Sequence, residues 1–130
     1  MSTMNRLANS HNPYQGSAKK VLCVCSAGLL RSPTMSRILS QEPYNYNTRA
    51  VGISKEFALI PLDEVLITWA DEIVFVSNEV YEEALKKFEE RLHPKDVTVL
   101  DIPDNFEYMD STLVLHILEQ YNEASKENGT

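Results

Sequence analysis

The chain has 130 residues, of which 43% are hydrophobic and 24% are charged, with four Gly and six Pro. This length is typical of one globular domain of roughly 100–200 residues, and the composition excludes collagen-like, coiled-coil and disordered chains. The formal net charge of −7 argues against nucleic acid as a partner, because domains that bind nucleic acid usually present a basic face. No segment has the roughly 20 apolar residues of a membrane-spanning helix, so we expect no membrane partner.

The two cysteines, Cys23 and Cys25, are too few for the disulfide framework of a small secreted protein. They stand two positions apart, which is too close for an unstrained disulfide within a strand. The N-terminus also lacks the charged-then-apolar pattern of a secretory signal. We therefore expect a soluble protein in a reducing, cytoplasmic setting.

Residues 1–18 are polar and lack periodicity, which predicts a mobile tail ahead of a single domain at 19–130. Short apolar runs rich in β-formers predict buried strands at 19–25, 72–76 and 97–100. The region 46–53 fits a further strand.

Helices are expected between these strands. The first should have Ser32 as its N-cap and Pro33 at its first helical position, and it should stop before Pro43. The others are expected at 61–69, from Ser77 or Asn78 to about 92, and at 112–126. This alternation predicts an α/β fold, with a parallel sheet covered by helices on both faces. Such sheets bind ligands beyond the carboxyl ends of their strands, where the loop after the first strand and the segment 101–110 both lie.

The segment 25–32 (CSAGLLRS) follows the first strand, opens the first helix and leaves five residues between a Cys and an Arg. Main-chain amides and a helix N-terminus in such a loop attract an anion, and the Arg31 guanidinium can bind two phosphate oxygens. The positive potential of these amides, the helix N-terminus and the guanidinium also favours the thiolate form of Cys25, which is a nucleophile. Gly28 permits the positive φ of a tight loop. The expected phosphate-binding residues are Ser26, Ala27, Gly28, Leu29, Leu30, Arg31 and Ser32. The alternative is that Cys25 is a small buried hydrophobic residue and Arg31 a surface residue.

The sequence CSAGLLRSP resembles the phosphate-binding loop of low-molecular-weight protein tyrosine phosphatases, whose motif is Cys-x5-Arg-Ser/Thr. Together with WADEIVFVS and LDIPDNFEYMD, it is most similar to a short bacterial branch of predicted protein tyrosine phosphatases. The resemblance runs from about Lys20 to the last helix. It implies a four-stranded parallel sheet with flavodoxin-like winding, helices on both faces, a phosphocysteine intermediate and neither metal nor cofactor.

By this resemblance Cys25 is the nucleophile, Arg31 holds the phosphate and the Ser32 hydroxyl stabilises the thiolate. The family usually has Gly and Asn where this chain has Ala27 and Gly28. The Asn side chain normally braces the loop in a left-handed turn. Gly28 permits that turn but supplies no such brace.

Release of a phenolate-like oxygen needs a proton donor, usually a carboxylic acid. The family's acid lies in an Asp-Pro-aromatic segment after a strand, and alignment with 103–106 implies that Asp104 is the acid and that Phe106, with Leu29, lines the substrate pocket. Asp101 is the alternative acid; its other role would be a cap at the strand end. Asp110 is expected to cap the last helix.

The other reactive side chains are expected to be structural. Cys23 fits the core better than the role of a redox partner, and Trp69 fits packing better than substrate contact. The three histidines share no metal-ligand spacing, so no metal site is expected; they are His11, His93 and His116.

Three functional hypotheses follow. The leading one is a phosphomonoester hydrolase of the tyrosine phosphatase type, acting on a phosphorylated protein or a small phosphate ester. The second is a phosphate-binding regulatory module with weak or no turnover, motivated by Ala27, Gly28 and Asn105. The third is a thiol-dependent arsenate reductase, for which only Cys23 or an external thiol could serve, because Leu30 replaces the family's second loop cysteine.

Overall fold

The computed structural model describes residues 18–26, 31–54, 60–103 and 108–127. It contains one four-stranded sheet, ordered β2-β1-β3-β4, in which every pairing is parallel. The strands are β1 (Lys20–Cys25), β2 (Asn47–Gly52), β3 (Glu72–Phe75) and β4 (Asp96–Val99). The predicted α/β fold is therefore confirmed, and each strand lies within two residues of its expected position.

The strands form where apolar residues run without interruption. Residues 21–24 of β1, and residues 73–75 of β3 together with the following Val76, are fully buried, as expected of central strands in a sheet that is covered on both faces. Val24 is aligned with Phe75 of β3 on one side, and Cys25 with Gly52 of β2 on the other. The central strand β1 thus carries Cys25 at its carboxyl end.

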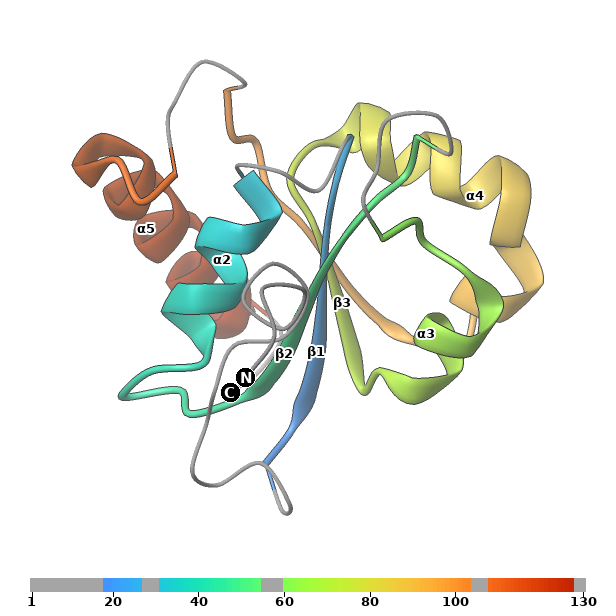
Figure 1. Ribbon diagram of the computed structural model, residues 1–130, viewed down its shortest axis with the longest axis horizontal. Coiled ribbons are helices and arrows are strands. Elements are labelled where there is room, and N and C mark those ends of the chain that lie inside the picture. Colours follow the sequence, from blue (N-terminus) through green and yellow to red (C-terminus); the bar gives the residue numbers. More distant parts are fainter. Residues whose placement is uncertain (1–17, 27–30, 55–59, 104–107, 128–130) are drawn as a thin grey trace.

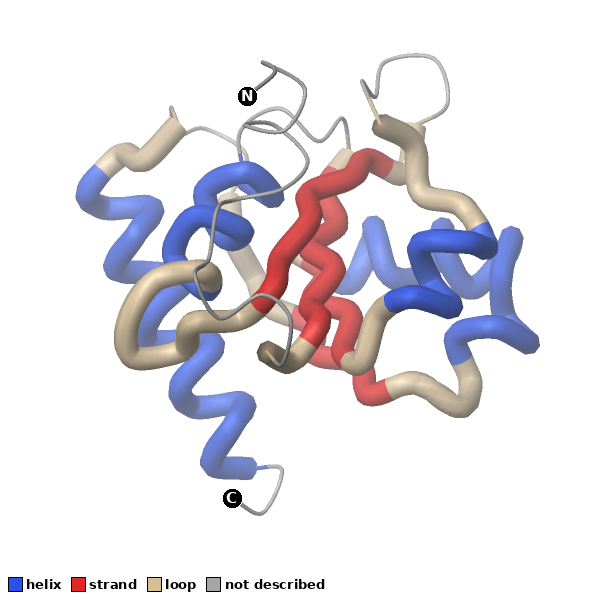
Figure 2. The backbone as a smooth tube through the Cα atoms, turned by 60° about the horizontal axis from the view of Figure 1, so that its bottom comes forward, coloured by secondary structure: helices blue, strands red, loops and turns tan. Residues whose placement is uncertain are grey.

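The helices form one layer on each face of the sheet (Figures 1 and 2). α2 (Arg31–Leu39) and α5 (Ser111–Glu127) pack together on one face. α3 (Glu64–Trp69) and α4 (Asn78–Leu92) pack together on the other. The chain leaves β1 toward β2 on one side and crosses to β3 on the other, so the strand order switches beside β1. Parallel sheets bind ligands at such a switch point.

Two of the expected helix starts were wrong. α2 begins at Arg31 rather than after Ser32, so Ser32 lies inside the first turn and its hydroxyl is directed to other partners. α3 begins at Glu64 rather than at Pro61, with Asp63 as its N-cap and the Leu66 amide donating to the Asp63 carboxylate. Pro61 instead forms a β-bridge with Gly52. The Ser77 cap of α4 is confirmed by the Val80 amide, which donates to the Ser77 hydroxyl.

A buried carboxylate ties α5 to the sheet at the end opposite Cys25. The Glu72 carboxylate, at the start of β3, accepts hydrogen bonds from the Tyr121 hydroxyl at 2.9 Å and the Thr98 hydroxyl at 2.6 Å. The Lys19 ammonium lies 2.8 Å from it. Burial lowers the pKa of Lys19, but the hydrogen bond and charge of Glu72 outweigh this and raise it overall. Because its partners surround it, Glu72 can stay buried in a parallel sheet.

Candidate active site

The candidate site lies at the carboxyl edge of the sheet, where β1 ends and α2 begins. The main chain continues sheet-like pairing past the strand ends, since the Ile53 amide donates to the Cys25 carbonyl at 2.9 Å and the Ile102 amide to the Val76 carbonyl at 2.9 Å. In Figure 1 the end of β1, the start of α2 and the segment after β4 all reach this edge. Two segments far apart in sequence are thus brought together, as the fold class predicts.

The Cys25 thiol and the Ser32 hydroxyl lie 3.1 Å apart, both buried. The Ser32 hydroxyl also donates to the Val51 carbonyl, at 3.2 Å. A hydroxyl has one proton to donate and two lone pairs. It can therefore accept from a thiol while bonded to Val51, or turn its proton to a thiolate, which is the stronger acceptor. This geometry places Ser32 where a hydroxyl can stabilise a sulfur anion.

The Arg31 guanidinium is buried and directed to the same edge of the sheet. Its Nη1 donates to the Ile102 carbonyl at 2.9 Å and its Nη2 to the Ser26 hydroxyl at 3.5 Å. These two bonds hold the planar group between the segment after β1 and the segment after β4. The structure therefore contradicts the alternative that Arg31 is a surface residue, whereas Cys25 is as buried as that alternative requires.

The described ends of the segment after β4 are bonded by a side-chain amide and by a helix cap. The Gln120 side chain of α5 accepts from the Asp101 amide at 2.6 Å and donates to the Asp101 carbonyl at 2.8 Å. The Asp110 carboxylate accepts from the Thr112 and Leu113 amides at 2.8 and 3.3 Å. The predicted cap of the last helix is thus confirmed. Asp101 stands at the strand end with an exposed side chain.

Several predicted site residues lie outside the described residues. In the phosphate loop these are Ala27, Gly28, Leu29 and Leu30. In the second segment they are Asp104, Asn105 and Phe106. The tail at 1–18 is described only at its last residue. Of the predicted site, the structure brings together Cys25, Ser26, Arg31 and Ser32.

Cys23 lies two residues before Cys25 in β1 and is completely buried. Burial raises the pKa of the Cys23 thiol well above its usual range, and the charge of Glu72 adds to this. A buried thiol of high pKa is a poor nucleophile. The prediction that Cys23 belongs to the core is confirmed. Trp69 is half-buried and packs against the core, and the Arg49 guanidinium lies 4.6 Å from its ring centre.

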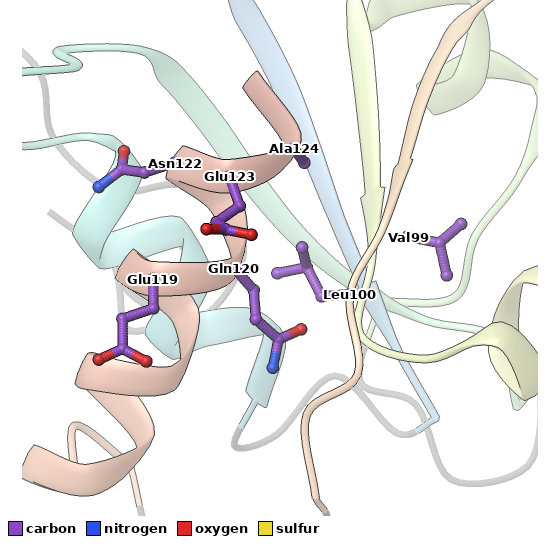
Figure 3. A pocket seen from close by; sticks show the side chains of 7 residues that line it. All are labelled: Val99, Leu100, Glu119, Gln120, Asn122, Glu123 and Ala124. Atoms are coloured by element: carbon purple, nitrogen blue, oxygen red, sulfur yellow. The ribbon is translucent and has the colours of Figure 1, made fainter. Parts of the chain in front are cut away.

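Within the described ranges, no three His, Cys, Asp or Glu side chains are placed to hold a metal ion. The same part of the chain has no helix that is long and apolar enough to span a membrane. A hollow of about 590 Å³ lies between β4 and α5 (Figure 3), and Cys25 is not among the residues that line it. Its lining includes the carboxylates of Glu119 and Glu123 and no basic side chain. Carboxylates repel phosphate, so this hollow is a poor phosphate site.

Sequence reasoning missed the contacts that join α2 to the segment after β4. Besides the Arg31 bond to Ile102, the Met109 amide donates to the Thr34 hydroxyl at 3.0 Å. These partners are more than 70 residues apart in sequence, and no local pattern signals such pairs. The polar Thr34 at a buried position of a helix was the one available signal.

Comparisons with known proteins agree on the fold. No family model and no curated protein matches the sequence. Among solved structures, Wzb of Vibrio vulnificus in complex with benzylphosphonate has a TM-score of 0.61 and 19% identity, over 85% of this chain and 97% of that one. A YwlE mutant of Bacillus subtilis has a TM-score of 0.60 and 19% identity, over 85% of this chain and 99% of that one. The YwlE arginine phosphatase of Geobacillus stearothermophilus has a TM-score of 0.59 and 17% identity, over 85% of this chain and 93% of that one. The chain has the fold of these proteins along nearly their whole length.

Proposed function

We propose that the protein is a cysteine-dependent phosphatase that hydrolyses phosphate esters through a phosphocysteine intermediate. The observation that carries the proposal is the arrangement of Cys25, Arg31 and Ser32 at the carboxyl end of the central strand. The thiol and the hydroxyl are 3.1 Å apart, and the buried guanidinium is directed to the same edge. The sequence CSAGLLRSP supplies the Cys-x5-Arg-Ser motif of low-molecular-weight protein tyrosine phosphatases.

The structural neighbours support the same reaction class. Two of them are YwlE proteins, one described as an arginine phosphatase, and the third was solved with benzylphosphonate, which mimics a phosphate ester. In this chain we propose that the Cys25 sulfur attacks phosphorus in line while Arg31 and the loop amides hold the phosphoryl oxygens. Ser32 then donates to the sulfur when water displaces it as the leaving group. Positioning and electrostatics supply most of the rate acceleration in such transfers.

The proton for the departing oxygen is proposed to come from Asp104, with Asp101 as the alternative. Both belong to the segment that follows β4, whose Ile102 carbonyl accepts from Arg31. Once the ester oxygen has left, the same carboxylate would take a proton from the attacking water. Phe106 and Leu29 are proposed to line the substrate pocket.

An arsenate reductase needs a second thiol within reach of the first. Cys23 is the only other cysteine of the chain, and it is completely buried with a raised pKa. The chain's own residues therefore do not favour a thiol relay. A phosphate-binding module without turnover remains the second candidate, because Ala27, Gly28 and Asn105 depart from the family motif.

Turnover of an aryl phosphate in the presence of a chelator tests the proposal. The wild type should release phosphate, and Cys25→Ser should abolish release, because a serine hydroxyl at this position is a weak nucleophile. Cys23→Ala is the matched control, since it removes a thiol from the same strand and should keep the activity. Full activity in Cys25→Ser would refute the proposal. Phosphate binding without turnover would favour the regulatory module.

A second substrate separates two classes of phosphatase. The wild type should be assayed on phosphotyrosine and on phosphoarginine at equal concentration, because one of the similar structures is an arginine phosphatase. We propose phosphotyrosine or another phosphate ester as the substrate class. A strong preference for phosphoarginine would retain the nucleophile and overturn that choice of substrate.

A further inference from the structure

A side-chain amide of α5 holds the main chain next to the residue that contacts Arg31. The Gln120 side chain accepts from the Asp101 amide at 2.6 Å and donates to the Asp101 carbonyl at 2.8 Å. In Figure 3 it extends from α5 toward the chain beyond Leu100. An amide that bonds both polar groups of one residue pairs with it as a neighbouring strand would. Gln120 therefore fixes the position and the direction of the main chain at Asp101.

The next residue along the chain carries the contact with Arg31. The Ile102 carbonyl accepts from the Arg31 Nη1 at 2.9 Å, and the Ile102 amide donates to the Val76 carbonyl at 2.9 Å. Both Ile102 and Arg31 are buried. A guanidinium is planar and carries its donors in a rigid fork, so a bond at one nitrogen orients the whole group. Hydrogen bonds thus connect α5, the main chain after β4 and the Arg31 guanidinium in series.

We propose that Gln120 is a positioning residue for Arg31: by holding Asp101, its side-chain amide places the Ile102 carbonyl where that carbonyl orients the Arg31 guanidinium for binding phosphate. This role rests on the proposed phosphatase function, in which Arg31 holds phosphoryl oxygens. Gln120 acts through Arg31 in this proposal and does not itself bind the phosphate.

Orientation matters because a guanidinium binds two phosphate oxygens at once only when its plane faces them. Without the Gln120 amide, water would bond the polar groups of Asp101, which is exposed. The Ile102 amide would keep its bond to Val76, so the chain should stay on the sheet while the Ile102 carbonyl can turn. A displacement of about 1 Å in a group that contacts the substrate can lower a rate by on the order of 100-fold.

The test variant is Gln120→Met, which removes both bonding groups and keeps the side-chain length and a good helix former. Titration with inorganic phosphate, followed by NMR, should show binding weakened roughly 10-fold. kcat/KM should fall by a similar factor for 4-nitrophenyl phosphate and for phenyl phosphate, because Arg31 serves good and poor leaving groups alike. The Nη–H signals of Arg31, which a held guanidinium keeps separate, should broaden or merge in Gln120→Met.

Asn122→Leu is the matched control. Asn122 lies two residues further along α5, and its side chain accepts from the Tyr44 hydroxyl. The substitution therefore removes another side-chain amide that bonds α5 to the rest of the fold, without affecting Asp101. Asn122→Leu should keep the wild-type phosphate affinity and the wild-type Arg31 signals. Urea unfolding of both variants measures any loss of stability separately.

A double-mutant cycle separates positioning from a general structural effect. Arg31→Lys keeps the charge and loses the fork. If Gln120 acts through Arg31, adding Gln120→Met to Arg31→Lys should change phosphate affinity by less than about twofold, because the two effects are not additive. Equal weakening with and without Arg31→Lys would overturn the proposed role, and so would unchanged affinity in Gln120→Met.

Failure of the proposed function is distinguishable from failure of this role. A wild type that binds phosphate and hydrolyses no ester would refute the phosphatase, while the titrations of Gln120→Met and of the cycle would still decide the role of Gln120. A wild type that does not bind phosphate would overturn both.

Discussion

The Ser32 hydroxyl has two buried partners, the Cys25 sulfur at 3.1 Å and the Val51 carbonyl at 3.2 Å. We expect Ser32→Ala to reduce the reactivity of Cys25, because the thiolate loses a donor. A hydrogen bond to a charged group contributes roughly 1.5–3 kcal/mol, so alkylation by iodoacetamide at pH 7 should slow about 10- to 150-fold. Ser36→Ala, in the same helix, is the control and should alkylate at the wild-type rate. Unchanged alkylation in Ser32→Ala would mean that the contact does not stabilise the sulfur.

The choice between two aspartates is also decided at the residue scale. If Asp104 is the acid, Asp104→Asn should slow release of a poor leaving group by roughly 10²–10⁴-fold and affect a good leaving group much less. The stability of the Asp104→Asn variant should change little. Asp101→Asn should change the rates of leaving-group release only modestly. Steady-state rates over a series of aryl phosphates give the comparison. Dependence on the leaving group that appears in Asp101→Asn and not in Asp104→Asn would reverse the assignment.

α5 is held by hydrogen bonds at its first turn and around residues 120–122, where the Tyr44 hydroxyl also donates to Asn122. Asp110 caps its first turn, Gln120 bonds the main chain of Asp101, and Tyr121 donates to Glu72 in β3. The first two contacts involve the described ends of the segment after β4. The last helix therefore does more than cover the sheet, because it positions one edge of the candidate site.

The cap of α5 predicts a loss of stability without a specific kinetic effect. Asp110→Ala should lower the free energy of unfolding by about 0.5–2 kcal/mol, because the Thr112 and Leu113 amides lose their acceptor. Asp110→Asn should stay near the wild type, since Asn is an equally good cap. Urea unfolding measures both. A change of activity confined to poor leaving groups in Asp110→Asn would instead give Asp110 an acid role.

At the scale of the whole molecule, the sequence predicts the fold because its signals there are strong and local. The buried runs 21–24 and 73–76 permit few alternatives to central strands. The first residue of a helix was harder to predict, because it depends on contacts with distant residues that the sequence does not show. Pro61, a good first residue of a helix, forms a bridge with Gly52 instead. The Ser32 hydroxyl contacts Cys25 and Val51 rather than capping α2.

The candidate site was predictable to a different degree in its two halves. The loop after β1 is one continuous motif, so Cys25, Arg31 and Ser32 could be selected together. The links from Arg31 to Ile102 and from Thr34 to Met109 join distant parts of the chain. Their partners include main-chain groups, which carry no side-chain signature. Glu72 is the one acidic residue in a buried strand, which indicates that it has buried polar partners. Those partners could not be predicted, because Lys19 precedes β1, Thr98 lies in β4 and Tyr121 lies in α5.

The buried network around Glu72 predicts how the stability of the whole molecule depends on pH. Burial raises the pKa of Tyr121, and the charge of Glu72 raises it further. Burial likewise raises the pKa of Cys23 well above its usual value. A group whose pKa is raised by folding holds its proton more tightly in the folded state. Its contribution to the free energy of unfolding is complete below the pKa that the group has in the unfolded chain, and is lost as the pH rises above that value toward the pKa in the folded state.

The free energy of unfolding should therefore fall above about pH 8.5, where Cys23 titrates in the unfolded chain, and more steeply above about pH 10, where Tyr121 does. Each group contributes a slope of about 1.4 kcal/mol per pH unit. Cys23→Ala should remove the part that begins near pH 8.5. Tyr121→Phe should lower the slope above pH 10 by about 1.4 kcal/mol per pH unit, and the raised pKa values of Tyr44 and Lys19 should leave a remaining slope there. Urea unfolding from pH 7 to 11 under reducing conditions measures the slopes, with Tyr108→Phe as the control because that ring is exposed. If Tyr121→Phe keeps the wild-type slope above pH 10, the Tyr121 proton is not coupled to folding, and the bond to Glu72 does not restrain its ionisation.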